Sequence, residues 1–226
     1  ASAPPSVSGY HYEMDAATFG PLVAALLLLL ISFPVHEAAH ATAAWKLGDG
    51  HARALGRVSL DPRRHIDPLG AGLLLLSALS GGGMIGWAKP TPVMAQSLRG
   101  GSLGWALVAV AGPLSNLVLA AASAALYHLL GRPPLSDLAG ALIVYFTYFN
   151  AGLFFLNLLP IPPFDGRALL TGLLTLVSPR LADLVEGLTA SRFAFPVVIV
   201  LLFFTPLGSI LGDLSLGLTQ QLLDPR

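Results

Sequence analysis

Long apolar segments alternate with short polar connections along most of this chain. Between Phe19 and Val35 there is no charged residue, and the run is mostly Leu, Ala and Val. A membrane-spanning helix needs about 20 predominantly apolar residues, so the pattern predicts a first long helix that continues to about Trp45. Two further segments, over residues 103–130 and 139–159, are apolar and long enough to predict two more spans.

Residues 69–85 can either cross the membrane or enter it and return. They are barely long enough to span, and the sequence after them, G-W-A-K-P-T-P-V, has two prolines that predict extended backbone. Non-helical backbone at membrane depth is tolerated where it lines a cavity. We favour a re-entrant hairpin over about 69–95, because it keeps Lys89 and Arg99 on the side of the cationic loop before it.

The remaining apolar segments are less regular. Residues 168–177 are too short to span comfortably, and residues 193–218 are interrupted by a proline and a glycine. The pattern does not predict the path of residues 166–192. We predict an all-α polytopic membrane protein with about five to six apolar helical segments, in which residues 1–18 form a polar tail and residues 19–226 a single transmembrane domain.

The composition supports a membrane protein and excludes several other classes. Of 226 residues, 54% are hydrophobic and 11% are charged, whereas soluble domains carry about 25% charged residues. The formal net charge of zero argues against nucleic acid as a partner. Because there is no cysteine, a bound metal would depend on His, Asp or Glu.

The charges also predict an orientation. There is no Lys or Arg before the first span, whereas residues 46–68 contain a cluster of them. By the positive-inside rule, the N-terminus is expected outside and this loop in the cytoplasm. The Ala-, Leu-, Arg- and Gly-rich composition suggests a bacterial source, and hence a multi-pass protein of the bacterial inner membrane.

The candidate chemistry lies near the end of the first predicted span, in the sequence S-F-P-V-H-E-A-A-H-A. His36 and His40 are four residues apart, so on a helix both imidazoles can face one metal ion. Glu37 is placed to act on a metal-bound water without being a ligand. Ionisable groups at membrane depth cost roughly 2.5–3.5 kcal/mol each, which favours a functional role. Pro34 predicts a kink or local opening that admits water.

A hydrolytic zinc site usually has three protein ligands, so a third must come from elsewhere. Asp165 is the best candidate, because it follows a helix end broken by prolines, and Gly166 beside it allows close backbone approach. An aspartate before a glycine is also an ordinary turn residue, so this reading stays open. His65, Asp67 and His128 are the competing candidates for the third ligand.

Four motifs together resemble the site-2 protease family, the intramembrane zinc metalloproteases of the M50 type. They are H-E-A-A-H (36–40), G-W-A-K-P (86–90), G-P-L-S-N (112–116) and N-L-L-P-I-P-P-F-D-G (157–166), in the family's order. The resemblance covers nearly the whole chain after residue 19. It fits the short form without PDZ or CBS domains, and the loop at 57–68 is also similar to that subgroup.

The resemblance implies a zinc endopeptidase that hydrolyses peptide bonds within the transmembrane segments of membrane protein substrates. His36, His40 and Asp165 would hold one Zn²⁺ per chain, and Glu37 would activate a zinc-bound water. The implied partners are transmembrane-helix proteins and the lipid bilayer. Oligomeric state, substrate identity, cleavage site and trigger do not follow from the sequence.

Two further groups of residues are candidates for substrate binding. Asn116 and Asn157 match family asparagines proposed to hold substrate or stabilise the oxyanion, although hydrogen bonding between helices is an equal alternative. The extended segment offers an edge to which an unwound substrate can add as a strand. The residues expected to form that edge are Trp87, Ala88, Lys89, Thr91 and Val93.

Two other classes of function are alternatives to a protease. A zinc or cation transporter would use Glu37 as a ligand or proton relay, but transporters usually contain paired repeats, and no second motif of this kind is present. A non-cleaving membrane scaffold is the other alternative. The complete set of two histidines, one glutamate and one aspartate argues against it.

Overall fold

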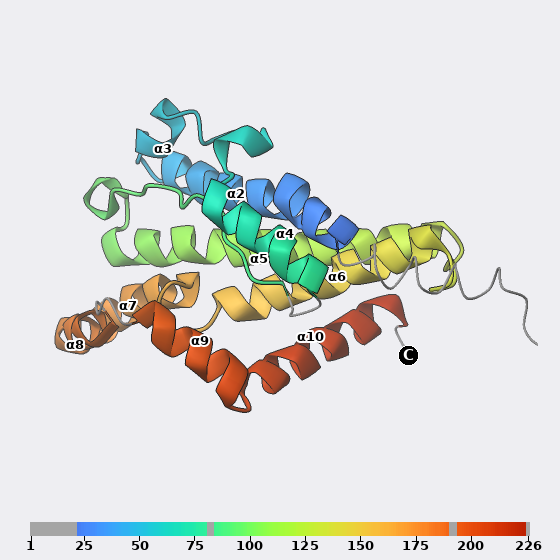
Figure 1. The fold of residues 1–226 in the computed structure, drawn as a ribbon. Coiled ribbons are helices and arrows are strands. Elements are labelled where there is room, and N and C mark those ends of the chain that lie inside the picture. Colours follow the sequence, from blue (N-terminus) through green and yellow to red (C-terminus); the bar gives the residue numbers. More distant parts are fainter. Residues whose placement is uncertain (1–21, 81–83, 190–193, 225–226) are drawn as a thin grey trace, which may run out of the picture.

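Helices account for nearly all regular structure in the computed structural model, which describes residues 22–80, 84–189 and 194–224 (Figure 1). The expected all-α membrane fold is confirmed, and the predicted polar tail lies outside the described residues. The elements are η1 (Leu28–Ser32), α2 (Phe33–Lys46), α3 (His51–Ala54), η2 (Pro62–Arg64), α4 (Pro68–Ser80), η3 (Ala95–Ser97), α5 (Gly101–Leu129), α6 (Leu138–Asn157), α7 (Asp165–Val177), α8 (Pro179–Thr189), α9 (Ala194–Phe204) and α10 (Leu207–Leu223).

Three helices in the described part of the chain are long and apolar enough to cross a membrane: Leu22–Lys46, Gly101–Leu129 and Leu138–Asn157. They correspond to the three long spans that the hydrophobic pattern predicts. Helix α5 packs against α2 on one side and α6 on the other (Figure 1). The central helix therefore contacts α2, which carries the H-E-x-x-H motif, as well as α6.

The first span contains a local change of helical geometry just before the H-E-x-x-H motif. Pro34 has no amide hydrogen and cannot donate to a carbonyl one turn earlier. A π-helical turn, η1, occupies Leu28–Ser32 directly before α2. Such widened turns are common near functional sites. This is the local opening that the proline predicts.

The segment after the cationic loop forms a short apolar helix followed by an extended return, the geometry expected of the re-entrant hairpin. Helix α4 has 13 residues, which is too short to cross a bilayer that needs about 20. The chain then returns in an extended conformation, and the Lys89 N–H donates to the His65 carbonyl at 2.7 Å. Ile66 and Ala88 form an isolated antiparallel bridge. The chain thus returns to the end from which α4 departs.

The far end of the returning segment is attached to the C-terminal end of α2. The buried carboxylate of Asp49 accepts a hydrogen bond from the Met94 N–H at 2.6 Å. The Arg99 N–H donates to the Leu47 carbonyl at 2.7 Å. The extended segment is therefore held beside the helix that carries the motif.

The part of the chain whose path the sequence does not predict forms α7 and α8. Helix α7 packs against α5, where a Cβ on Gly172 would lie 2.8 Å from the Ser102 carbonyl oxygen. The last apolar segment is divided into α9 and α10, which meet at a bend (Figure 1). Helix α10 packs against α6. The interruption occurs at Pro206, as the proline indicates.

His65, at the base of the hairpin, predicts a pH dependence of stability. Its ring is fully buried and its Nε2 pairs with the Ser59 carbonyl at 2.7 Å, and burial lowers the pKa of the imidazole below its usual 6.5. As the pH falls below about 6.5, the unfolded chain binds a proton there more readily than the folded chain, so stability decreases.

We expect the melting temperature of the detergent-solubilised protein to decrease as the pH is lowered from 7.5 to 5.5. His65→Gln, which keeps a side-chain donor but does not titrate, should show a smaller decrease. Equal decreases in both proteins would contradict this account.

Candidate metal centre

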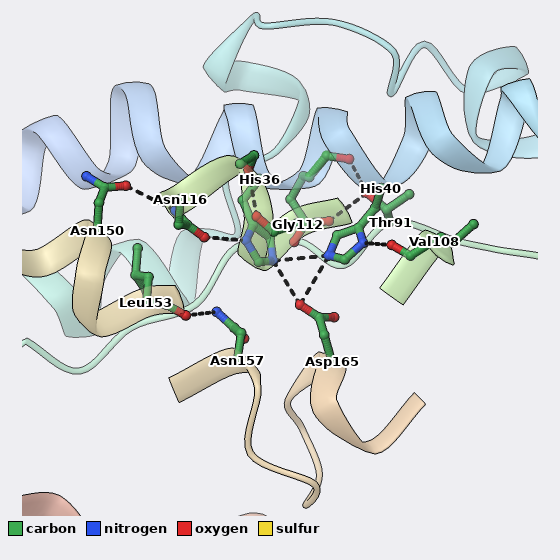
Figure 2. Close-up of polar contacts among 12 residues, drawn as sticks. His36, His40, Thr91, Val108, Gly112, Asn116, Asn150, Leu153, Asn157 and Asp165 are labelled. Atoms are coloured by element: carbon green, nitrogen blue, oxygen red, sulfur yellow. Dashed lines mark hydrogen bonds and ion pairs between the residues drawn. The ribbon is translucent and has the colours of Figure 1, made fainter. Parts of the chain in front are cut away.

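Three ligand atoms from two distant parts of the chain converge at one point (Figure 2). His36 and His40 lie on the same face of α2, with their Nε2 atoms 3.1 Å apart. The Oδ2 atom of Asp165 lies 3.1 Å from the first nitrogen and 3.2 Å from the second. The structure thus brings together the three residues that the sequence analysis selects as metal ligands.

Asp165 reaches this point because the chain turns sharply between α6 and α7. Helix α6 ends at Asn157, and the proline-rich segment that follows leads into α7, whose first residue is Asp165. A Cβ on Gly166 would clash with the carbonyl groups of Leu158 and Leu159. Glycine therefore allows the close backbone approach that places the carboxylate opposite the histidines.

The other nitrogen of each imidazole is held by a hydrogen-bond acceptor from α5. His36 Nδ1 is 2.6 Å from the Asn116 side-chain oxygen, and His40 Nδ1 is 2.8 Å from the Val108 carbonyl oxygen. Because both partners accept, each Nδ1 must carry the proton, which leaves the Nε2 lone pairs directed at the centre. This tautomer is the one that binds metal, and such partners commonly orient metal-ligating histidines.

The orientation of Asn116 is itself determined by a second asparagine. Its amide nitrogen donates to the Asn150 side-chain oxygen at 3.0 Å, and the Asn150 amide donates to the Phe146 carbonyl at 2.9 Å. Both asparagines are fully buried. The network extends from the centre through α5 to α6 and fixes which atom of Asn116 faces His36 (Figure 2).

The arrangement fits a bound cation. With both imidazoles neutral, two Nε2 lone pairs and a carboxylate oxygen face one another at about 3 Å, and a positive ion among them would relieve their repulsion. Two histidines and one aspartate are a zinc ligand set that leaves a position open. Space is provided by Gly112, where a Cβ would lie 2.7 Å from His36 Cε1 and closer still to His40 Nε2.

Glu37 lies beside the ligand set without belonging to it. Its carboxylate oxygen Oε2 accepts a hydrogen bond from the Thr91 hydroxyl at 2.6 Å. The same hydroxyl is 3.0 Å from the Glu37 backbone carbonyl oxygen. The side chain is mostly buried. A carboxylate in this position can accept a proton close to the converging ligand atoms.

A cavity of about 1000 Å³ opens from the centre. The three ligands and Glu37 lie in its wall together with the extended segment, and the remaining wall is mostly apolar. Residues of α9 and α10 also contribute to it, including Leu202 and Leu211. The volume is sufficient for a peptide segment rather than a water molecule alone.

The other predicted site residues occupy different positions relative to this cavity. Asn157 lies in its wall and donates to the Leu153 carbonyl at 3.0 Å, whereas Asn116 lies behind His36. Substrate contact by Asn157 stays a prediction. From the extended segment, the wall includes Trp87, Ala88, Thr91 and Val93.

The competing ligand candidates lie elsewhere. His65 pairs with the Ser59 carbonyl, and the Asp67 carboxylate accepts from the first amides of α4. His128 pairs with the Leu222 carbonyl at 3.0 Å. Each of these side chains has a local structural partner, so the described part of the chain contains one cluster suited to a metal.

Sequence reasoning missed one residue near the centre. Arg57, assigned only to the cationic loop, is buried, and a terminal nitrogen lies 3.8 Å from Glu37 Oε2. Burial lowers the pKa of the guanidinium, and the charge of Glu37 opposes that change. The only sequence signal was its position in the loop at 57–68.

Comparisons with known proteins identify bacterial relatives over most of the chain. The Bacillus subtilis protein named "Putative zinc metalloprotease YwhC" is 37% identical over 190 residues, which is 81% of this chain and 81% of that protein. "Putative zinc metalloprotease Rip2" of Mycobacterium tuberculosis is 34% identical over 199 residues, 86% of this chain and 71% of the relative. The Mycolicibacterium smegmatis protein of that name is 32% identical over 175 residues. No family model and no solved structure matches the chain.

The two asparagines predict different effects on metal binding. Asn116→Ala removes the acceptor that orients His36, so we expect zinc affinity to fall by about 10–100-fold. Asn157→Ala removes a side chain of the cavity wall without a contact to either histidine, so zinc affinity should stay at the wild-type value. Competition with a fluorescent chelator measures both. Equal affinity in the two variants would contradict the orienting role of Asn116.

Proposed function

The chain belongs to a family of zinc metalloproteases, and from this premise we propose that it is an intramembrane endopeptidase of the site-2 protease type. It would hydrolyse peptide bonds within transmembrane segments of other membrane proteins. The observation that carries the proposal is the placement of the three converging ligand atoms and Glu37. They lie on and beside a helix suited to span a membrane, at the wall of a largely apolar cavity.

His36, His40 and Asp165 are the residues that would hold one zinc ion per chain. Zinc bound there would polarise the scissile carbonyl and lower the pKa of a water molecule to about 7. Around it, Asn116 and the Val108 carbonyl hold the two imidazoles in the tautomer that binds metal. The polar groups needed for chemistry are thus oriented before a substrate enters.

Glu37 is proposed as the general base and then the general acid. Thr91 holds its Oε2 atom, while Oε1 has no partner among the described residues and is free to take a proton from the attacking water. The carboxyl group would then deliver that proton to the departing amine. Peptide hydrolysis is balanced in this way, because the water supplies the hydroxyl to the carbonyl carbon and the proton to the nitrogen.

The extended segment is proposed to hold an unwound substrate as an added strand. Lys89 uses its backbone N–H and C=O toward the loop side, where they bond to His65 and Arg57. Ala88 is the bridge partner of Ile66, and in an antiparallel pair neighbouring residues direct their backbone groups to opposite sides. The Ala88 N–H and C=O therefore face away from the loop and are the groups offered to a substrate.

The transporter and scaffold alternatives are less well supported. Glu37 is bonded to Thr91 and is not part of the ligand set, as expected for a base and not for a ligand. The described residues contain no second metal cluster of the kind that a repeated transport pathway would require. We also propose a bacterial inner-membrane location, with the N-terminus outside and the loop at 46–68 in the cytoplasm.

Replacement of Glu37 tests the function most directly. We expect Glu37→Gln to lose about 100- to 10,000-fold in cleavage of transmembrane peptides in lipid vesicles, because it cannot accept a proton. Its zinc content should equal that of the wild type, because it is not a ligand. Mass spectrometry of the products should place the cut inside the apolar segment.

Glu186→Gln is the matched control, since this exposed glutamate pairs with Arg167 and belongs neither to the ligand set nor to the cavity wall. It should cleave at the wild-type rate. The protease proposal would be rejected in favour of a transporter by two results together. Zinc-loaded wild type would cleave none of the transmembrane peptides, and zinc would cross the vesicle membrane.

The strand-addition step predicts an effect of proline at position 88. Ala88→Pro removes the N–H that faces the cavity, and loss of one such hydrogen bond should lower kcat/KM by about 2- to 10-fold with zinc still bound. Ala95→Pro is the control, because Ala95 is exposed at the first position of η3, where proline is tolerated. Equal activity of the two variants would contradict strand addition at Ala88.

A further inference from the structure

Arg57 differs from the other arginines of its loop. It lies between α3 and η2, and its exposed fraction is 4%, whereas Arg53, Arg63 and Arg64 are exposed. Burying a guanidinium costs several kcal/mol unless charge and hydrogen-bond partners compensate for it. A loop arginine that serves only to orient the protein in the membrane would have no reason to be buried.

The contacts of Arg57 connect the loop, the extended segment and the base. One terminal nitrogen donates to the Lys89 carbonyl, and the other donates to the Arg64 carbonyl at 2.6 Å. The nitrogen that bonds to Lys89 is also 3.8 Å from Glu37 Oε2. Glu37 is the one carboxylate within ion-pair distance of this guanidinium among the described residues.

These contacts place the Glu37 carboxylate and the edge at Ala88 in one unit. Thr91, which bonds to Glu37, belongs to the extended segment, and Arg57 bonds to the carbonyl of the residue that follows Ala88. Two separate contacts therefore fix the distance between the proposed base and the backbone groups that would receive a substrate. Of these two contacts, only the one through Arg57 also reaches the loop at 46–68.

We propose that Arg57 is a positioning residue of the reaction: it holds the extended edge at Ala88 in register with the Glu37 carboxylate. The proposal rests on the proposed proteolytic function. Arg57 would thus have a role in turnover although it is neither a metal ligand nor itself part of the cavity wall. Arginine suits this role, because a planar guanidinium can donate to two carbonyls while its charge faces a carboxylate.

The test uses Arg57→Gln and Arg57→Lys in the 226-residue chain, with Arg63→Gln as the control. Arg63 is an exposed arginine of the same loop, so its replacement removes one charge without disturbing the edge. We expect Arg57→Gln to lower kcat by about 10–100-fold, with a smaller change in KM and an unchanged zinc content. Arg57→Lys should recover part of kcat, because it keeps the charge near Glu37 and one donor.

A second readout is independent of cleavage. The chain has no cysteine, so Ala88→Cys provides a single thiol on the edge. A maleimide should modify this thiol faster when Arg57 is replaced by Gln than in the Arg57 background, because the edge is released from the loop. The same comparison with Arg63→Gln should show no change.

The outcomes separate this inference from the proposed function. A wild type without proteolytic activity would reject the proposed function, and the labelling rates would still test the attachment of the edge. The positioning role would be overturned by unchanged labelling, or by wild-type kcat in Arg57→Gln. It would also be overturned if Arg57→Lys lost zinc together with activity, because Arg57 would then support the fold and not the register.

Discussion

Mutual repulsion among three electron-rich atoms is the constraint on which the rest of this structure depends. With both imidazoles neutral, two ring nitrogens and one carboxylate oxygen approach within about 3 Å of one another, an arrangement that is unfavourable without a cation. The fold holds them there through contacts outside the centre. Helix α5 supplies the acceptors that fix both imidazoles, and Gly112 leaves the space between them. The turn from α6 into α7 delivers Asp165. A stable apolar bundle alone would need none of these features.

The parts of this design that follow local patterns could be predicted from the sequence. The three long spans are visible as apolar runs, and His36 and His40 have helical spacing that places them on one face. Asp165 could be selected because few ionisable residues occur at membrane depth. What the sequence could not provide was pairing between distant segments. Asn116 could equally have contacted substrate or another helix, and only its position behind His36 assigns it to orientation of the ring. Arg57 resembled its exposed neighbours, because burial of a loop residue depends on what folds over it.

The helix α4 and the extended return after it are a second case in which tertiary contacts supply what the sequence left open. The apolar segment was too short to be a secure span, but its length alone did not show where the chain returned. The bond from Lys89 to His65 and the contact of Asp49 with Met94 settle the path, since both attach the extended segment to the end of the molecule where α2 stops. The burial of Asp49 and His65, which are polar residues in a loop, is the physical cost of this attachment. The Asp49 carboxylate and the Nε2 atom of His65 each have a backbone partner.

An extended backbone beside an apolar cavity must satisfy its hydrogen-bonding groups or leave them for a ligand. The backbone N–H and C=O of Lys89 bond to the loop, whereas those of Ala88 face the opposite side. Pro90, the next residue on the side of Ala88, has no N–H to donate. The edge is consequently short, and its recognition would depend on backbone groups because Ala88 has a minimal side chain. Recognition of this kind tolerates many sequences but excludes an intact helix, whose own amides and carbonyls are already paired. Under the proposed function, selectivity would then depend on how readily a substrate helix unwinds.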